Sequence, residues 1–233
     1  MQYINPYIGL CLEGPLSIFK DLNQKEKETI AQHHIVHTVK KGDFLVKEGD
    51  KVRGVVFLAS GKAKIFKVGV GGREQILKMV RQQECIGYGT LFGQNTWSFS
   101  VAAIEDSIIC VLERLHLVRI LKKNIEFSLK LNSILTYDLW QSYNRTVSLS
   151  QKHVRGRLVE SLLMLADIYG YEEDGKTLIA TLSREDIAHL SNMTTSNAIR
   201  ALSSLASEGK IAIKGRKIII LEKDRLEQIS LLG

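Results

Sequence analysis

The chain has 233 residues, of which 45% are hydrophobic and 24% charged. This composition is typical of a folded globular protein and excludes a mainly disordered chain. No apolar run approaches the ~20 residues that a membrane-spanning helix needs. The N-terminus lacks the basic-then-apolar pattern of a secretion signal, so we expect a cytoplasmic protein with no membrane partner.

The formal net charge of +7 permits a nucleic-acid partner. However, residues 152–233 hold 12 Lys or Arg against 11 Asp or Glu, so the positive excess lies in the first 151 residues. Three cysteines, Cys11, Cys85 and Cys110, form no Cys-x-x-Cys pair. They are too few for a four-cysteine metal or iron–sulfur site and are expected to be small buried apolar residues.

The first predicted element is a short helical region over residues 16–35, where Asn23 and Glu26 resemble a capping box. From residue 38 to about 113, glycine turns alternate with short β-rich runs. These runs cover residues 44–46, 55–58, 63–68, 75–80 and 107–112. Strands of this length between such turns predict an antiparallel barrel or jelly roll.

A long helix is predicted from about residue 118 to 150, because this region has no proline or glycine and its apolar residues recur every three or four positions. A helix this long, with a narrow apolar stripe, favours a two-fold coiled-coil dimer over packing on its own barrel alone. The expected dimer residues are Ile125, Leu129, Asn132, Leu135, Leu139 and Tyr143.

A second domain is predicted after residue 150. An amphipathic helix over 154–168 is followed by one from Ser183 to Leu190, one from Thr194 to Leu205, and two short strands at 211–213 and 217–221. Helix, turn, helix and β-hairpin in this order form a winged helix-turn-helix. Asn192 occupies the turn, where a left-handed residue is expected.

The expected DNA-binding residues lie at the start of the second helix of this motif and in the hairpin. Arg200 can donate two bonds to guanine, and Asn197 can make the matching pair with adenine. The lysine and arginine residues of the hairpin are expected to contact DNA phosphates. The full predicted set is Ser183, Thr194, Thr195, Ser196, Asn197, Arg200, Lys214, Arg216 and Lys217.

These motifs together resemble the CRP/FNR family of bacterial transcription regulators over nearly the whole chain. The resemblance rests on residues 17–22, on the glycine-punctuated run from Lys41 to Gly61, and on residues 187–202. It implies an α+β fold with an N-terminal antiparallel β-roll of the cyclic-nucleotide-binding type (1–117), a dimerisation helix (118–150) and a winged helix-turn-helix (151–233). It also implies a homodimer that binds a two-fold site in double-stranded DNA, with RNA polymerase as a further candidate partner.

Two departures from the family pattern are informative. The recognition helix of the family often carries Arg-Glu-x-x-x-Arg, of which only the last residue is kept here, as Arg200.

Cyclic-nucleotide-binding members carry Phe-Gly-Glu and then Arg-Ser, where this chain has Ile86-Gly87-Tyr88 and Trp97-Ser98. A buried phosphate without a cation is strongly unfavourable, so a response to cyclic AMP is not expected.

Three interpretations of this altered pocket stay open. Tyr88, Phe92 and Trp97 fill it, or it binds a small apolar effector, or it holds haem with His33, His34 or His37 as ligand candidates. No cofactor is predicted beyond these alternatives, and no metal site. The residues assigned to the pocket are Gly87, Tyr88, Gly89, Thr90, Trp97 and Ser98.

An enzyme is not expected, since no histidine lies between Lys41 and Glu113 to build a cupin-type metal cage and no nucleophile-elbow, Walker A or HExxH motif is present. The alternative function is a ligand-sensing β-roll subunit whose C-terminal domain binds a protein partner instead of DNA.

Overall fold

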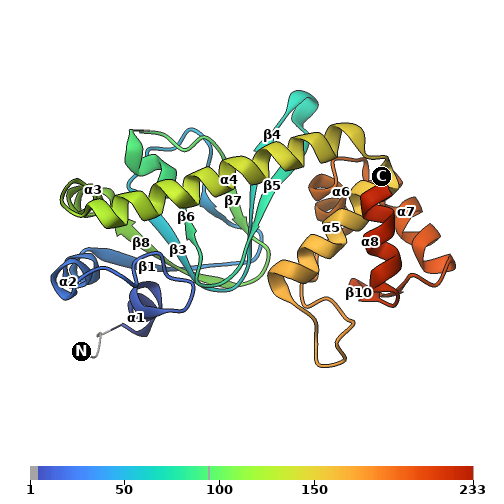
Figure 1. The fold of residues 1–233 in the computed structure, drawn as a ribbon, viewed down its shortest axis with the longest axis horizontal. Helices are drawn as coiled ribbons and strands as arrows, with labels where there is room; N and C mark the ends of the chain where they lie inside the picture. The colour runs from blue at the N-terminus through green and yellow to red at the C-terminus, as the bar shows by residue number, and fades with distance from the viewer. Residues whose placement is uncertain (1–4, 94, 233) are drawn as a thin grey trace. The chain divides into compact units, whose positions relative to one another are not determined.

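The computed structural model describes residues 5–93 and 95–232, which divide into two compact units (Figure 1). Of these residues, 5–67, 80–93 and 95–140 belong to the first unit, and 68–79 and 141–232 to the second. Within the described residues, no helix is both long and apolar enough to cross a membrane.

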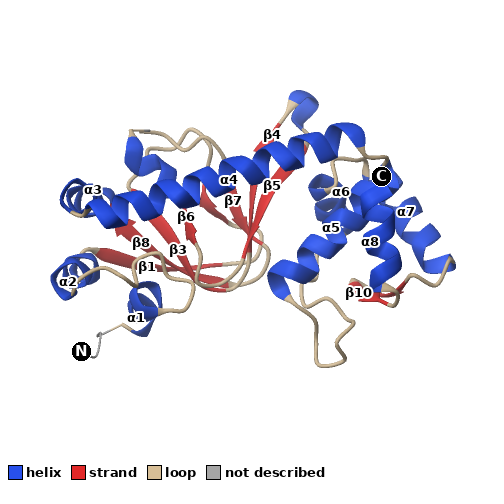
Figure 2. Cartoon of the chain, viewed as in Figure 1, coloured by secondary structure: helices blue, strands red, loops and turns tan. Residues whose placement is uncertain are grey.

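Two four-stranded sheets form the β-roll (Figure 2). One has the order β1-β8-β3-β6, with each neighbouring pair antiparallel, and the other has the order β2-β7-β4-β5. The strands are β1 (His34–Val39), β2 (Phe44–Val46), β3 (Gly54–Ser60), β4 (Ala63–Val68), β5 (Glu74–Val80), β6 (Cys85–Ile86), β7 (Ser100–Ala103) and β8 (Ser107–Glu113). The predicted strands are confirmed, whereas β1, β6 and β7 were not predicted.

Strand β3 joins two apolar cores because both of its faces are covered. Successive side chains of a strand point to opposite faces. Val55 and Phe57 accordingly lie in the core beneath the N-terminal helices, and Val56 and Leu58 lie in the core between the sheets. This continuous apolar run is typical of a strand buried on both sides.

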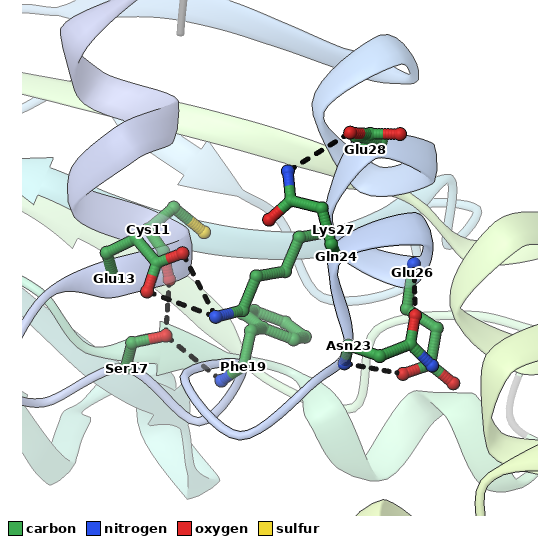
Figure 3. A network of polar contacts seen from close by, with 9 residues as sticks. All are labelled: Cys11, Glu13, Ser17, Phe19, Asn23, Gln24, Glu26, Lys27 and Glu28. Atoms are coloured by element: carbon green, nitrogen blue, oxygen red, sulfur yellow. Dashed lines mark hydrogen bonds and ion pairs between the residues drawn. The ribbon is translucent and has the colours of Figure 1, made fainter. Parts of the chain in front are cut away.

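Four helices accompany the β-roll: α1 (Pro6–Glu13), α2 (Gln24–Gln32), α3 (Arg114–Lys123) and α4 (Ile125–Gln151). The capping box of Asn23 and Glu26 is confirmed at the start of α2 (Figure 3), while residues 16–23 lie outside any helix. Helix α1 was not predicted. Asn5 caps it by accepting a hydrogen bond from the Tyr7 amide, and Pro6 fits its first turn.

The single helix predicted over residues 118–150 is wrong at its start. The chain breaks at Asn124, so residues 118–123 belong to α3 and the long helix begins at Ile125. The Asn124 side chain accepts a hydrogen bond from the Phe127 amide and donates to the carboxylate of Glu26. A capping asparagine therefore starts a new helix where the apolar spacing alone looked continuous.

The second unit contains α5 (Val154–Tyr169), α6 (Arg184–Leu190), α7 (Thr195–Ser207), β9 (Ile211–Lys214), β10 (Lys217–Ile220) and α8 (Lys223–Leu232). The predicted order of helix, turn, helix and hairpin is confirmed. Helix α8 was not predicted; it packs on α5 and buries Leu226. Two short 3-10 helices, Val70–Gly72 and Tyr88–Phe92, complete the elements.

Candidate DNA-binding surface and effector pocket

The turn between α6 and α7 has the left-handed residue expected of it. Asn192 has a φ of 50°, a conformation that asparagine tolerates better than most residues. The apolar side of α7 is buried through Ala198, Leu202 and Leu205. This packing fixes which side of α7 faces away from the domain.

Two predicted DNA-binding residues cap helices. The Ser183 hydroxyl accepts from the Asp186 amide at 2.9 Å, and the Thr194 hydroxyl accepts from the Asn197 amide at 3.3 Å. Both side chains thereby satisfy amides at the starts of α6 and α7, amides that lack a partner within their own helix. The structure gives them a positioning role in addition to any contact with phosphate.

The exposed side of α7 presents the remaining predicted residues of the recognition helix. Ser196 and Arg200 are exposed, and Thr195 and Asn197 are half-buried. Arg200 Nη2 donates to Asn197 Oδ1 at 2.6 Å. A bidentate contact of Asn197 with adenine needs that same oxygen, so the structure does not leave Asn197 free to read a base independently of Arg200.

A shallow hollow of about 410 Å³ lies beside this pair and was not predicted. It is lined by Val154, Arg155, Asn197, Arg200, Ala201 and Ser204. Arg155, at the start of α5, forms a two-point ion pair with Glu208, which raises the pKa of Arg155 and lowers the pKa of Glu208. Only packing of α5 on α7 brings Arg155 here, so spacing within one motif could not have placed it.

The lysine and arginine side chains of the hairpin differ in whether they are paired with another residue. Within residues 5–93 and 95–232, the side chains of Lys214 and Arg216 have no hydrogen-bond or ion-pair partner, and both are exposed. Lys217 is instead paired with Glu172 at 2.6 Å. Arg184 donates to the Gly215 carbonyl at 2.8 Å and so ties the start of α6 to the hairpin turn. Sequence reasoning missed this contact.

In the pocket segment, residues 86–93 and 95–98, the Trp97 ring lies directly against Gly87. This side chain is 4% exposed, and a Cβ atom at Gly87 would overlap its ring. Gly87 has a φ of +83°, so glycine is favoured there by backbone conformation as well as by the close approach of the ring. Trp97 also meets the edge of Phe99, with ring centroids 5.6 Å apart.

Tyr88 connects the pocket segment to α4. Its buried hydroxyl donates to Oδ2 of Asp138. Burial, and then the hydrogen bond to Asp138, hold the pKa of Tyr88 far above its ordinary value, so the phenol stays a neutral donor. At this position, where the pattern of cyclic-nucleotide-binding members has Glu, the chain has a phenol that is already hydrogen-bonded.

The other pocket residues have local roles. Thr90 donates to the Gly87 carbonyl at 2.7 Å, Gly89 packs against Leu135 of α4, and Ser98 is exposed. The expectation that Phe92 helps fill the pocket is wrong, since its side chain is 49% exposed.

The histidines considered as haem ligands lie at the far edge of the first sheet. His34 and His37 are on β1, whereas the pocket segment follows β6 at the opposite edge. His33 Nδ1 is hydrogen-bonded to the Thr29 carbonyl, and its ring stacks on His116. The residues present therefore do not fit haem ligation in the pocket. Among the described residues, no group of three His, Cys, Asp or Glu side chains could hold a metal ion.

Helix α4 has two apolar faces. Phe127 and Leu131 are buried in the core of the first unit, and Leu135 packs against that core, so Leu135 does not belong to the free stripe as predicted. The opposite face, the outer stripe, has apolar side chains that are all more than half exposed: Ile125, Leu129, Leu139, Trp140, Tyr143 and Val147. Asn132 is also exposed on this side.

Comparison with known proteins agrees with this architecture. The family model of the cyclic nucleotide-binding domain matches residues 36–124, and that of the Crp-like helix-turn-helix domain matches residues 156–229. The chain is 26% identical over 187 residues to a CRP-like cAMP-activated global transcriptional regulator of Mycobacterium tuberculosis, covering 80% of this chain and 84% of the relative. It is 24% identical to electron transport regulator A of Shewanella oneidensis, covering 94% of this chain and 88% of the relative.

Solved structures show the same fold. FixK2 from Bradyrhizobium japonicum superposes with a TM-score of 0.76 at 20% identity, covering 84% of this chain and 96% of that one. A CRP/FNR-family transcriptional regulator of Thermus thermophilus gives a TM-score of 0.69 at 22% identity, covering 84% and 98%. The two family models match the chain in the expected order, and the similar proteins are transcription regulators that match it over most of their length. The chain therefore belongs to the CRP/FNR family of transcription regulators, with a helix-turn-helix DNA-binding domain.

Proposed function

We propose that the protein is a homodimer that binds a two-fold site in duplex DNA and regulates transcription without responding to cyclic AMP. The lack of a response to cyclic AMP is proposed because the Trp97 ring packs on Gly87. A cyclic phosphate at this position would have to displace a buried indole. Because the indole carries no positive charge, the phosphate would also lack the cation that a buried phosphate needs.

Arg200 is the side chain proposed to read a guanine in each half-site. It lies on the exposed side of α7 and is hydrogen-bonded to Asn197, which restricts its rotamers before DNA binds. Asn197 therefore acts as a positioning residue for Arg200. Lys214 and Arg216, exposed and unpaired within the described residues, are the proposed phosphate contacts of the hairpin.

The homodimer is proposed on the outer stripe of α4. The spacing alternates between four and three residues through Ile125, Leu129, Asn132, Thr136, Leu139 and Tyr143. Four of these six residues are apolar, and this pattern is typical of a coiled-coil seam. In a two-fold pair the recognition helices would have to lie about 34 Å apart to enter successive major grooves. RNA polymerase as a further partner stays a prediction of the family resemblance, and a cytoplasmic location stays the expectation drawn from the composition and the N-terminal sequence.

The testing experiment is selection from a random duplex pool by the purified protein without added effector, followed by sequencing. We expect a two-fold site with guanine at matching half-site positions. A thermal melt with cyclic AMP, run beside a cyclic-AMP-activated relative as positive control, should show no shift. A folded dimer that selects no duplex would favour the alternative of a protein-binding C-terminal domain, and a cyclic-AMP-dependent shift would contradict the filled pocket.

A further inference from the structure

The C-terminal end of α6, where the turn of the helix-turn-helix begins, is bonded to two other elements of the second unit. The last four carbonyls of a helix lack a partner within it. Two of those of α6 accept hydrogen bonds at 3.0 Å from backbone amides of the turn. The other two accept from side chains: His189 from Gln75 of β5 at 2.8 Å, and Leu190 from Arg145 of α4. All four carbonyls are therefore satisfied, and a side chain of the long helix holds the last of them.

Arg145 lies on the side of α4 that is opposite to the outer stripe. Residues 141–151 of α4 belong to the second unit together with α5, α6 and α7. Tyr143 and Val147 of the outer stripe each lie two positions from Arg145 and are more than half exposed. Because two positions correspond to about 200° around a helix, the Arg145 side chain points toward the domain. One short segment of α4 thus carries the proposed dimer face on one side and the contact with the turn on the other.

The Arg145 guanidinium forms no ion pair with a carboxylate among the described residues. Its Nη1 lies 3.9 Å from the Met164 sulfur of α5, and its Nε is buried without a hydrogen-bond partner in the described part of the chain. The nearby carboxylate of Glu160 is engaged by Lys152 at 3.2 Å. Burial lowers the pKa of Arg145, because it disfavours the charged form. A half-buried cation without an ion pair costs folding free energy, so the benefit of Arg145 comes from the contacts that join α4 to α5 and α6.

The short turn fixes the start of α7 relative to Leu190. Ser191, which is fully buried, donates to Ser161 of α5 at 2.9 Å. Asn192 follows in the left-handed conformation, and α7 begins at Thr195. Since only these few fixed residues separate the two helices, holding the Leu190 carbonyl also holds the start of the recognition helix.

We propose that Arg145 is a positioning residue: it fixes the recognition helix relative to the dimer face of α4, and so sets the spacing of half-sites that a bound dimer accepts. This inference rests on the proposed homodimer and its two-fold DNA site. In such a dimer, the distance of each α7 from the two-fold axis depends on how the turn is held to the segment around Tyr143. Without the Arg145 bond that distance is less strictly set, because Leu190 loses its bond to α4.

The experiment compares purified wild type with Arg145→Met on the selected duplex and on two versions that have one base pair added or removed between the half-sites. One base pair shifts a half-site by about 3.4 Å and rotates it by about 35°. We expect wild type to bind the selected duplex at least about tenfold more tightly than either version, and Arg145→Met to bind all three within about threefold. Discrimination among single-base variants of the half-site should be unchanged, because Arg200 is intact.

Arg114→Met is the matched control. Arg114 on α3 is also half-buried, and its Nε is likewise buried with no hydrogen-bond partner among residues 5–93 and 95–232, but it belongs to the first unit. The substitution removes the same charge and should keep the wild-type preference for spacing. Arg145→Gln, whose side chain ends two atoms nearer the backbone, should lose the preference as Arg145→Met does. It provides the test if the methionine variant does not form a folded dimer.

Three results would overturn the inference while leaving the proposed function in place. One is an Arg145→Met dimer that discriminates between spacings as strongly as wild type. Another is a variant that loses base discrimination together with the spacing preference, since that is the effect of a disrupted helix-turn-helix. The third depends on no variant: a wild-type dimer that binds the two-fold site but accepts all three spacings alike. A wild type that selects no duplex at all would instead contradict the proposed function itself.

Discussion

The phenol of Tyr88 and the carboxylate of Asp138 are hydrogen-bonded between the pocket segment and the long helix. The bond joins a residue of the pocket to the helix whose opposite face is proposed to meet a second chain. A change at Tyr88 therefore alters a direct contact with α4.

Removing the Tyr88 hydroxyl should destabilise the protein. Tyr88→Phe loses a buried hydrogen bond to a charged acceptor, for which we expect a loss of about 1–3 kcal/mol in the free energy of unfolding. Tyr171→Phe is the matched control, because the Tyr171 hydroxyl is buried and has no hydrogen-bond partner among the described residues, so its removal should be neutral or stabilising. Urea unfolding of both variants measures the difference, and equal losses would contradict a stabilising bond.

Tyr88 should also give the stability a dependence on alkaline pH. Its pKa is raised in the folded state above the ordinary value of 10.0, so the folded chain keeps a proton that the unfolded chain releases. The contribution is fully present below pH 10.0 and is lost as the pH rises further. We expect the free energy of unfolding to fall less steeply in Tyr88→Phe than in wild type between about pH 9 and about pH 11. Identical slopes would show that another group titrates.

The contact of Gly87 with Trp97 can be separated from backbone strain. Gly87→Ala and Gly175→Ala both place alanine at positive φ, which costs about 1–2 kcal/mol in each. A Cβ at Gly175 meets nothing within 4 Å, whereas one at Gly87 overlaps the Trp97 ring. Gly87→Ala should therefore lose about 1–3 kcal/mol more. Equal losses in denaturant melts would mean that the indole moves aside without cost.

The outer stripe of α4 predicts a charge-sensitive dimer. Tyr143→Glu places a carboxylate in the proposed seam and should convert the dimer to a folded monomer at micromolar concentration. Asn144 is also exposed but lies about 100° further round the helix, so Asn144→Glu should remain dimeric. Sedimentation equilibrium distinguishes the two. A wild-type monomer, or two variants that dissociate alike, would argue against this seam.

Arg200 and Lys214 should affect DNA binding in different ways. Arg200→Ala should weaken binding to the selected site by about 1–3 kcal/mol and remove discrimination at one guanine position. Lys214→Ala should weaken all duplexes alike and lower the slope of log affinity against log salt by about 1. Titrations of the selected site and its single-base variants, at several salt concentrations, check both. If Arg200→Ala kept its guanine preference, the reading role would belong to another residue.

Much of the fold could be predicted because its signals are local. Glycine turns mark the strands of the β-roll, and apolar spacing with Asn192 marks the helix-turn-helix. Asn124 shows where prediction from local signals fails. The apolar spacing continues through residue 124, but the Asn124 side chain caps a new helix there and so breaks the one that was predicted. Trp97 and Tyr88 were placed in the pocket from sequence, but the partner of each depends on tertiary packing.

The residues missed were those whose role comes from another element. Arg155 lies beside Arg200 only because α5 packs on α7, and Arg184 contacts the hairpin only because the domain folds back. Contacts of this kind need the three-dimensional arrangement.

The anchoring of α4 at its first turn has a mechanical consequence. Asn124 caps the helix and is bonded to Glu26, and Phe127 and Leu131 bury the following turns, so the N-terminal end is fixed in the first unit. At about 1.5 Å per residue, the helix extends roughly 40 Å from this point. The part of α4 within the first unit, residues 125–140, is held at its cap, along its buried face and at Asp138, so a rearrangement at Tyr88 acts on a segment that is already fixed at two other places.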